Sequence, residues 1–341
     1  MRAAFGGDAG NVTIFGQSGG ASKVAVLMAM PVAQGLCHKA IIQSASSLIR
    51  MATPPEAERS TQALLSELGL GSGERIATLQ EVPMDKLLEA RRRAVATAGD
   101  NFRPVVDGRT LLAHPFDPAA PAASMNIPLL IGSCETELTF SLGTNPAHFT
   151  LAPAEAQRRV KLFLGIDDAG AAKLMDAYRG TRPGASPSDI MIAIMSDQMY
   201  RRNDILAAER KAAQAALGGA PAYLYLFTWK TPVLDGILKT PHTMCIPFVF
   251  GTVDAAKDML GTGEDRYELS DRVMGAWLAF ARHGNPNHKW LPQWQPYSAA
   301  VRSTMIFDNT CELVDDPLRE DRLALNEYPL YSPDAGARRA G

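Results

Sequence analysis

A glycine-rich pentapeptide with the pattern G-x-S-x-G, at residues 16–20, is the feature that most restricts how this chain can fold. Residues 12–15 before it are all β-branched or aromatic and predict a buried strand, and residues 21–28 after it predict a helix. A strand that turns into a helix this sharply needs small neighbours, because its backbone is strained and the helix passes close by. The pattern therefore predicts that Ser18 is exposed at the end of a sheet, at the positive end of a helix dipole, as a nucleophile. A glycine-rich surface turn is the alternative interpretation.

The composition limits the class of protein. The 341 residues, 46% hydrophobic and 21% charged, fit one large globular domain or two moderate ones. A net charge of −2 and a pI near 6.3 argue against nucleic acid or an anionic membrane surface as the main partner. Four scattered cysteines without metal-ligand spacing indicate reduced thiols in a cytoplasmic protein. The apolar runs are too short to span a bilayer, and no signal-like segment opens the chain.

Strand and helix patterns alternate along the chain, which predicts an α/β fold. The expected strands are residues 12–15, 40–44, 128–132 and 223–227. The expected helices include residues 56–68, 84–96, 188–217 with Ser188 as its cap, and 271–282, and an irregular packed tail is expected after residue 286. We expect one domain over residues 1–341, in which the mostly helical region 141–217 forms a lid or pocket wall.

A serine nucleophile needs a base that accepts its proton and an acid that orients the base. In folds with this strand–turn–helix motif the order is serine, acid, histidine, with the acid and the base just after later strands. Glu137 lies five residues beyond Gly132, at the end of the third expected strand. Glu135 competes with it, and both glutamates could instead be solvated loop residues.

His242 is the candidate base because it lies in a polar-then-apolar loop after the fourth expected strand. A buried structural histidine is the alternative interpretation for this residue. The other histidines precede a strand, lie in loops or flank the turn after the last helix, and have no obvious route to Ser18; they are His38, His114, His148, His283 and His288.

With these residues placed, the chain resembles the type B carboxylesterases, the family that also contains the cholinesterases. The resembling segments are residues 5–16, 35–44, 102–108, 132–140, 242–251 and 277–286. The resemblance implies an α/β-hydrolase fold, with a mostly parallel sheet flanked by helices, and a catalytic triad that needs no cofactor or metal. It implies that Ser18 is the nucleophile, that His242 is the base, and that the acid is Glu137 and not Glu135. Ser44 resembles a hydroxyl that the family places near the acid.

Several positions depart from the family pattern. Thr136 and Leu138 stand where the family usually has an acidic residue and a glycine around its triad acid. Gln17 and Gly19 flank Ser18, where the family often carries glutamate and alanine. We expect these changes to alter the solvation of the acid and the floor of the pocket.

The resemblance also implies a long region before Phe5, with the first strands of the sheet and an HGG loop that supplies most oxyanion-hole amides. No HGG occurs in this sequence, so the N–H of Gly19 is the one donor that can be assigned. Met1 falls within the helix that would lead to the nucleophile. We therefore expect the chain to be the C-terminal two-thirds of an esterase, with the first strand as a bare sheet edge that promotes low solubility or self-association.

Two functions follow as hypotheses. The first is hydrolysis of neutral carboxylic esters of small to medium size through an acyl-enzyme, with a small-molecule substrate and no nucleic-acid partner. The second is a catalytically inert truncated protein or binding module that keeps the fold without the chemistry. A serine peptidase of the same fold is disfavoured, because neither a propeller nor a cationic pocket is visible in the sequence.

Overall fold

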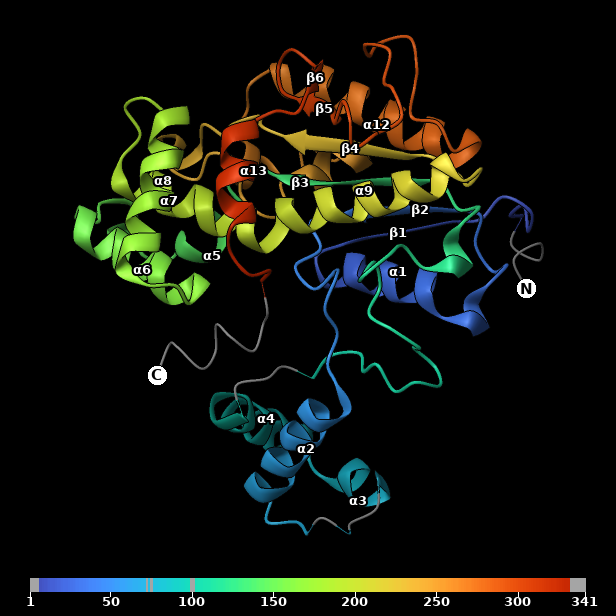
Figure 1. The fold of residues 1–341 in the computed structure, drawn as a ribbon, viewed down its shortest axis with the longest axis vertical. Helices are drawn as coiled ribbons and strands as arrows, with labels where there is room; N and C mark the ends of the chain where they lie inside the picture. Colours follow the sequence, from blue (N-terminus) through green and yellow to red (C-terminus); the bar gives the residue numbers. More distant parts are fainter. Residues whose placement is uncertain (1–5, 72, 74–75, 99–101, 332–341) are drawn as a thin grey trace.

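A single mixed sheet of six strands organises the computed structural model, which describes residues 6–71, 73, 76–98 and 102–331 (Figure 1). Met1 and Phe5, named above, lie outside the described residues. The strands, in both chain and spatial order, are β1 (Thr13–Gln17), β2 (Lys39–Gln43), β3 (Leu129–Cys134), β4 (Ala222–Phe227), β5 (Ser303–Phe307) and β6 (Glu312–Asp315). β1 to β5 run parallel and β6 is antiparallel to β5. The expected mostly parallel α/β sheet is confirmed.

Each face of the sheet carries its own apolar core. On one face, α1 (Gly19–Ala29) and α9 (Arg202–Ala216) pack on side chains such as Ile42 and Ile131. On the other face, α10 (Cys245–Phe250) and α12 (Asp265–His283) pack on side chains such as Tyr225. β2, β3 and β4 are buried along their whole length, because helices cover them on both faces.

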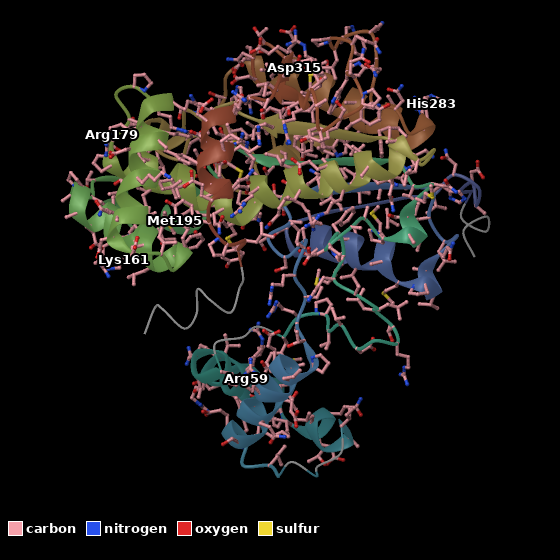
Figure 2. All side chains as sticks on the ribbon, viewed as in Figure 1. Arg59, Lys161, Arg179, Met195, His283 and Asp315 are labelled. Carbon is pink, nitrogen blue, oxygen red and sulfur yellow. The ribbon has the colours of Figure 1, made fainter. Side chains whose placement is uncertain are left out.

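Two further groups of helices lie beyond the sheet (Figure 1). One consists of α2 (Pro54–Glu67), α3 (Ile76–Glu81) and α4 (Met84–Ala98), and it carries Arg59 (Figure 2). The other consists of α5 (Thr139–Leu142), α6 (Pro153–Leu164), α7 (Asp168–Thr181) and α8 (Pro187–Ser196), and it carries Lys161, Arg179 and Met195 (Figure 2). The second group shares an apolar core of its own with α13 (Arg319–Asn326). The remaining short helices are η2 (Pro31–Ala33), η3 (Ala122–Ser124), η4 (Pro146–Phe149), η6 (Val233–Gly236) and α11 (Lys257–Leu260).

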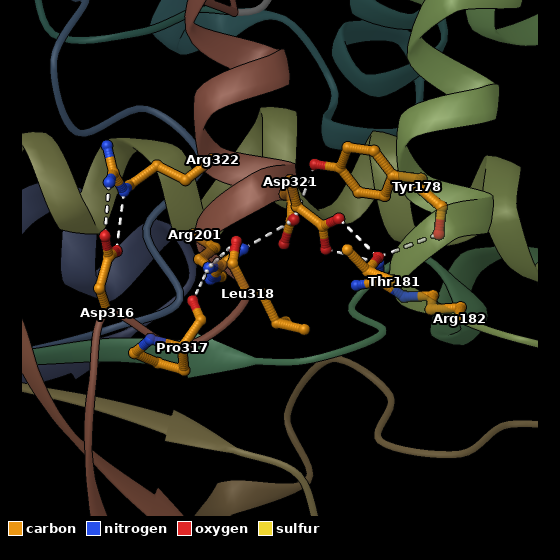
Figure 3. A network of polar contacts seen from close by, with 10 residues as sticks. Tyr178, Thr181, Arg182, Arg201, Asp316, Pro317, Leu318, Asp321 and Arg322 are labelled. Carbon is orange, nitrogen blue, oxygen red and sulfur yellow. Dashed lines mark hydrogen bonds and ion pairs between the residues drawn. The ribbon is translucent and has the colours of Figure 1, made fainter.

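A buried polar network fixes α13 against the second helical group (Figure 3). Thr181 Oγ1 donates a hydrogen bond of 2.7 Å to Asp321, which also pairs with Arg182. Arg201 donates to the carbonyl of Pro317 at 2.6 Å, just before α13 begins. Because Asp321 is fully buried, Thr181 and Arg182 provide the hydrogen bonds that its carboxylate needs away from water.

Two expectations about secondary structure are wrong. The helix expected over residues 188–217 is divided into α8, the π-helical turn η5 (Asp197–Arg201) and α9, and its cap is Ser186. The Ser186 hydroxyl accepts the N–H of Asp189 in a capping box, whereas the Ser188 hydroxyl accepts the N–H of Leu151. The tail expected to be irregular contains β5 and β6, because these short strands pair with the edge of the sheet.

β1 is the exposed edge of the sheet. Within the described residues it pairs with β2 alone, and its residues are partly buried except Phe15, which is exposed. Phe15 is 49% exposed and its ring lies 6.0 Å from that of Phe250, beside an open apolar groove of about 460 Å³ that Leu278 also lines. In the described part of the chain, no helix combines the length and the apolar character that crossing a membrane would require.

Candidate active site

The G-x-S-x-G motif forms a strained turn between β1 and α1. Ser18 has φ 56° and ψ −123°, in a region that residues other than glycine rarely adopt. Its N–H donates to the carbonyl of Gln43 on β2 at 2.9 Å, and its own carbonyl accepts the N–H of Ser22 at 3.1 Å. Strain of this kind persists where the surrounding structure holds it, and it is concentrated at functional sites.

Close packing explains the first glycine of the motif. A Cβ on Gly16 would lie 2.4 Å from the carbonyl carbon of Gly20 and 2.6 Å from its oxygen, so any side chain there collides with the backbone of α1. A Cβ on Gly20 would have no heavy atom within 4 Å. The strand and the helix therefore meet at Gly16, and the two glycines of the motif differ in what they tolerate.

The parallel sheet brings the three candidate residues to one edge. Ser18 follows β1 directly, Glu137 lies three residues after β3, and His242 lies in the loop between β4 and α10. Because β1, β3 and β4 run parallel, their carboxyl ends lie at the same edge of the sheet, where ligands of such folds bind.

Glu137 and His242 are in direct contact. Nδ1 of His242 is hydrogen-bonded to Oε2 of Glu137, whose other oxygen accepts the N–H of Cys134 at 2.7 Å. Glu137 is 1% exposed, so its carboxylate is surrounded by protein and has a partner on each oxygen. A carboxylate on Nδ1 holds the proton there and leaves Nε2 of the neutral imidazole as the acceptor.

Hydrogen bonds between two loops fix this contact. The N–H of His242 donates to the carbonyl of Glu137 at 3.2 Å, and the N–H of Thr136 donates to the carbonyl of Thr240 at 3.3 Å. The N–H of Thr240 in turn donates to the Thr136 hydroxyl at 2.8 Å, and the Thr139 hydroxyl donates to the carbonyl of Leu238 at 2.6 Å. Sequence reasoning missed this role, because it recorded Thr136 only as a departure from the family pattern.

Three further side chains surround the imidazole. The amide nitrogen of Gln17 lies 3.1 Å from Nε2 of His242. The ring of Tyr200, from the π-helical turn η5, lies 5.1 Å from the imidazole, and that of Phe140 lies 6.2 Å away. No spacing rule connects these residues to His242 in sequence. The interruption of a helix by a π-turn, which is frequent at functional sites, becomes visible only in the structure.

Glu135, Gly19 and Ser44 are the other residues that the sequence analysis assigned to the site or to its alternatives. Glu135 is not bonded to His242 in the part of the chain that the structure describes, and burial raises the pKa of its carboxyl. Gly19 is the first residue of α1, so its N–H has no acceptor within the helix. Ser44 is fully buried, with φ 55°, and its hydroxyl has no hydrogen-bond partner among the described residues.

Three of the other histidines make structural contacts instead. Nδ1 of His38 accepts the N–H of Val12 at 3.1 Å, and Nδ1 of His114 accepts the N–H of Met51 at 3.0 Å. Nε2 of His288 is bonded to the carbonyl of Arg272 at 2.9 Å. No group of three or more potential metal ligands gathers anywhere in residues 6–71, 73, 76–98 and 102–331.

Asp204 is another buried carboxyl, and sequence reasoning did not single it out. It lies on α9 with 1% of its surface exposed, and neither of its oxygens has a hydrogen-bond partner among the described residues. Burial, together with the charge of Glu137, raises the pKa of Asp204 well above its usual range. Burial therefore favours the protonated form of the Asp204 carboxyl in the folded protein.

Comparison with known proteins shows the family to which the chain belongs. A family model described as "Carboxylesterase family" matches residues 3–325. Para-nitrobenzyl esterase of Bacillus subtilis is 32% identical over 330 residues, which cover 94% of this chain and 63% of that protein. Phenmedipham hydrolase of Pseudarthrobacter oxydans is 28% identical over 334 residues, which cover 95% of this chain and 64% of that protein.

Solved structures agree with these matches. A carboxylesterase of Geobacillus stearothermophilus superposes with a TM-score of 0.79 at 32% identity, covering 95% of this chain and 65% of that one. An esterase of Clostridium hathewayi superposes with a TM-score of 0.70 at 29% identity, covering 95% of this chain and 62% of that one. The predicted α/β-hydrolase fold is confirmed. The chain spans slightly less than two-thirds of the length of these relatives.

The two motif glycines provide a matched test of the turn. We expect Gly16→Ala to lower the free energy of unfolding by about 2–3 kcal/mol, because its Cβ overlaps the backbone of α1. Gly20→Ala meets no atom and adds a better helix former, so we expect it to raise that free energy by about 0.5–1 kcal/mol. Urea denaturation followed by circular dichroism measures both. Equal effects of the two substitutions would contradict this account of the motif.

Asp204→Asn tests the neutral buried acid through the pH dependence of stability. Burial raises the pKa of Asp204 in the folded chain above its value of about 4 in the unfolded chain, so we expect the free energy of unfolding to decline as pH rises above about 4. The asparagine cannot ionise, so we expect the variant to be more stable than the wild type at pH 8 by about 1–3 kcal/mol, with the difference shrinking towards pH 4.

Asp271→Asn is the matched control, because Asp271 is exposed on α12. Denaturation of the wild type and both variants between pH 4 and 8 gives the comparison. If the difference in the free energy of unfolding between Asp204→Asn and the wild type did not change from pH 4 to pH 8, Asp204 would be charged in the folded protein.

Proposed function

The chain belongs to the carboxylesterase family, and on that premise we propose that it hydrolyses carboxylic esters with Ser18, His242 and Glu137 as a catalytic triad. The observation that carries the proposal is the contact between Glu137 and His242, at the same sheet edge as the strained Ser18 turn. The mechanism follows from the roles that such groups take in acyl transfer.

The reaction proceeds in two halves. Ser18 Oγ attacks the ester carbonyl carbon while Nε2 of His242 removes the hydroxyl proton, and Glu137 stabilises the imidazolium that forms. The imidazolium gives this proton to the departing alcohol, which leaves an acyl-Ser18 ester. Water then gives a proton to His242 and attacks the acyl carbon, and the proton returns to Ser18 as the acid is released.

The N–H of Gly19 is the proposed oxyanion donor, because it is unpaired within α1 and adjacent to Ser18. The resemblance implies further donors from an HGG loop, which is absent from this sequence. Loss of one such donor costs about 2.7–4 kcal/mol of transition-state stabilisation. We therefore expect the chain as a separate polypeptide to hydrolyse esters far more slowly than its longer relatives.

The proposed substrates are neutral esters of small to medium size. The aromatic rings of Phe140 and Tyr200 and the uncharged amide of Gln17 surround His242, and these groups favour an uncharged ligand. Two relatives are named for para-nitrobenzyl esters and for phenmedipham.

We propose further that residues 1–341 form one domain, that region 141–217 walls the pocket, that Ser44 supports the acid, and that the protein is cytoplasmic.

An inert esterase-like protein or binding module is the alternative. One observation favours it: in the described part of the chain the Ser18 hydroxyl makes no hydrogen bond to His242. Apo active sites often have loose catalytic hydrogen bonds, so geometry alone does not separate the two hypotheses.

Labelling with a fluorophosphonate separates them. We expect the probe to modify the wild type at Ser18, and we expect Ser18→Ala to lose both the label and the hydrolysis of p-nitrophenyl acetate, because the nucleophile is gone. Ser141→Ala is the control, since Ser141 is an exposed serine on the nearby helix α5. Hydrolysis that survives in Ser18→Ala would remove Ser18 from the mechanism, and a folded wild type that takes no label would favour the inert alternative.

We propose that two copies of this chain associate through β1. An apolar edge strand with unpaired backbone groups is a template for pairing with another chain, and Phe15 and Phe250 lie exposed beside it. The proposal concerns the chain as a separate polypeptide.

Sedimentation velocity tests this association. We expect Phe15→Glu to shift the wild-type dimer towards monomer at micromolar concentration, because a charge at the edge opposes burial. Leu217→Glu adds the same charge at an exposed apolar position at the end of α9 and is expected to leave the dimer intact. A wild type that sediments as a monomer would refute the association.

A further inference from the structure

A pocket of about 360 Å³ opens beside the first turn of α1. Gly19, the residue after Ser18, forms part of its wall. Met199 of the π-helical turn η5 lines it as well, and the next residue, Tyr200, packs on the imidazole of His242. The pocket therefore borders the proposed active site, and its volume is that of a site for a small molecule.

Lys23 places a positive charge in this pocket, close to the nucleophilic turn. Long side chains on a helix point back towards its N-terminus, and Nζ of Lys23 lies 3.2 Å from the carbonyl oxygen of Gly19, one turn earlier. A Cβ on Gly19 would lie 3.7 Å from the same nitrogen. The bonded partner is a neutral carbonyl, and no carboxylate of the described residues pairs with the ammonium. The protein therefore leaves this charge unneutralised beside the residue that follows Ser18.

The start of α1 adds to the positive potential. Helices commonly carry Asp or Glu in their first turn, because unpaired N–H groups and the helix dipole favour negative charge there. α1 has no acidic residue in its first turn, and Lys23 follows directly after that turn. No side chain of α1 offsets the positive end of the helix, so this side of the pocket favours an anion.

Two arginines from other segments line the same pocket. Arg91 belongs to α4, and Arg103 follows α4 and donates to the carbonyl of Arg50 at 3.5 Å. The other lining residues in the described part of the chain are uncharged, and they include Phe102 and Tyr331. Sequence reasoning found no cationic pocket, because its cations lie on segments that are far apart in the chain.

We propose that this pocket binds an acidic group of the substrate, so that the preferred substrates are esters that also carry a carboxylate. The inference rests on the proposed esterase function and narrows its substrate class. The ester group that reacts beside His242 is uncharged, and the carboxylate lies in a different part of the molecule.

The chemistry of the lining matches such a ligand. The ammonium of Lys23 donates a charge-assisted hydrogen bond to the carboxylate, and Arg91 and Arg103 attract it at longer range. The rings of Phe102 and Tyr331 provide apolar surface for the carbon chain that joins the carboxylate to the ester. An ester without the acid loses the charged contacts and keeps only the apolar ones.

Binding of monomethyl adipate, compared with the neutral dimethyl adipate, tests the pocket without requiring turnover. NMR titration of Ser18→Ala, which cannot form an acyl-enzyme, gives both dissociation constants. We expect the half-ester to bind about 5-fold more tightly at low ionic strength, as an exposed ion pair allows. We expect added salt to weaken the half-ester and to leave the diester unchanged, because salt screens exposed charges. Equal affinities, or no binding of the half-ester, would overturn the proposal.

Substitution of Lys23 in the same Ser18→Ala background tests the charge beside the turn. We expect Lys23→Met to weaken the half-ester about 3-fold and Lys23→Glu about 10-fold, because the reversed charge repels the carboxylate, with no change for the diester. Lys257→Met is the control, since Lys257 is an exposed lysine on α11 outside the pocket lining. Lys23 is itself exposed, so both variants are expected to keep the fold. Equal half-ester affinity with Lys23 and with Lys23→Glu would also overturn the proposal.

Methanol release by the protein with Ser18 intact separates this proposal from the esterase function. We expect kcat/KM to be higher for the half-ester than for the diester, and Lys23→Glu to lower it mainly through KM. Binding that follows the charge at residue 23 without any hydrolysis would support the acid-binding pocket and refute the esterase function. Hydrolysis of both esters with the same kcat/KM, unchanged in Lys23→Glu, would support the esterase function and overturn the pocket.

Discussion

The contact between the buried Glu137 carboxylate and the imidazole of His242 is the interaction on which the proposed site depends. A carboxylate that is 1% exposed is costly unless each oxygen has a donor, and Nδ1 and the N–H of Cys134 are those donors. The donors come from the β4–α10 loop and from the end of β3, so the contact forms only when these two segments are fixed relative to each other. The hydrogen bonds between Thr136 and Thr240 hold them, and the sheet beneath sets their separation.

The parts of the site that follow from local rules could be predicted from the sequence. The turn at Ser18 has its own motif, because Gly16 must let α1 pass. Spacing after β3 left both Glu137 and Glu135 as candidates for the acid, and the resemblance to the family chose Glu137. The parts that depend on contacts between distant segments could not. Thr136 functions through a partner more than 100 positions away, and Tyr200 reaches His242 only because a π-turn interrupts the expected helix.

The same distinction holds for the fold. Strands β2 to β4 each contain an apolar run and are covered on both faces, and the expected ranges come within a few residues of the observed ones. β5 and β6 lie in a stretch rich in turns and polar residues, and β6 is only partly buried or exposed. β5 pairs with the edge strand β4, and β6 pairs with β5. This pairing depends on the assembled sheet, so no periodic pattern in the sequence indicates it.

Glu137 and Asp204 show that burial alone does not decide what a carboxyl can do. Both are 1% exposed, and the two charges influence each other, since Glu137 contributes to the raised pKa of Asp204. Glu137 has a donor for each oxygen, whereas Asp204 has none among the described residues. Hydrogen bonds to both oxygens stabilise a carboxylate that must face an imidazolium, whereas burial without them favours the protonated acid. The hydrogen bonds made by the two loops therefore distinguish Glu137 from a carboxyl that is buried to the same extent.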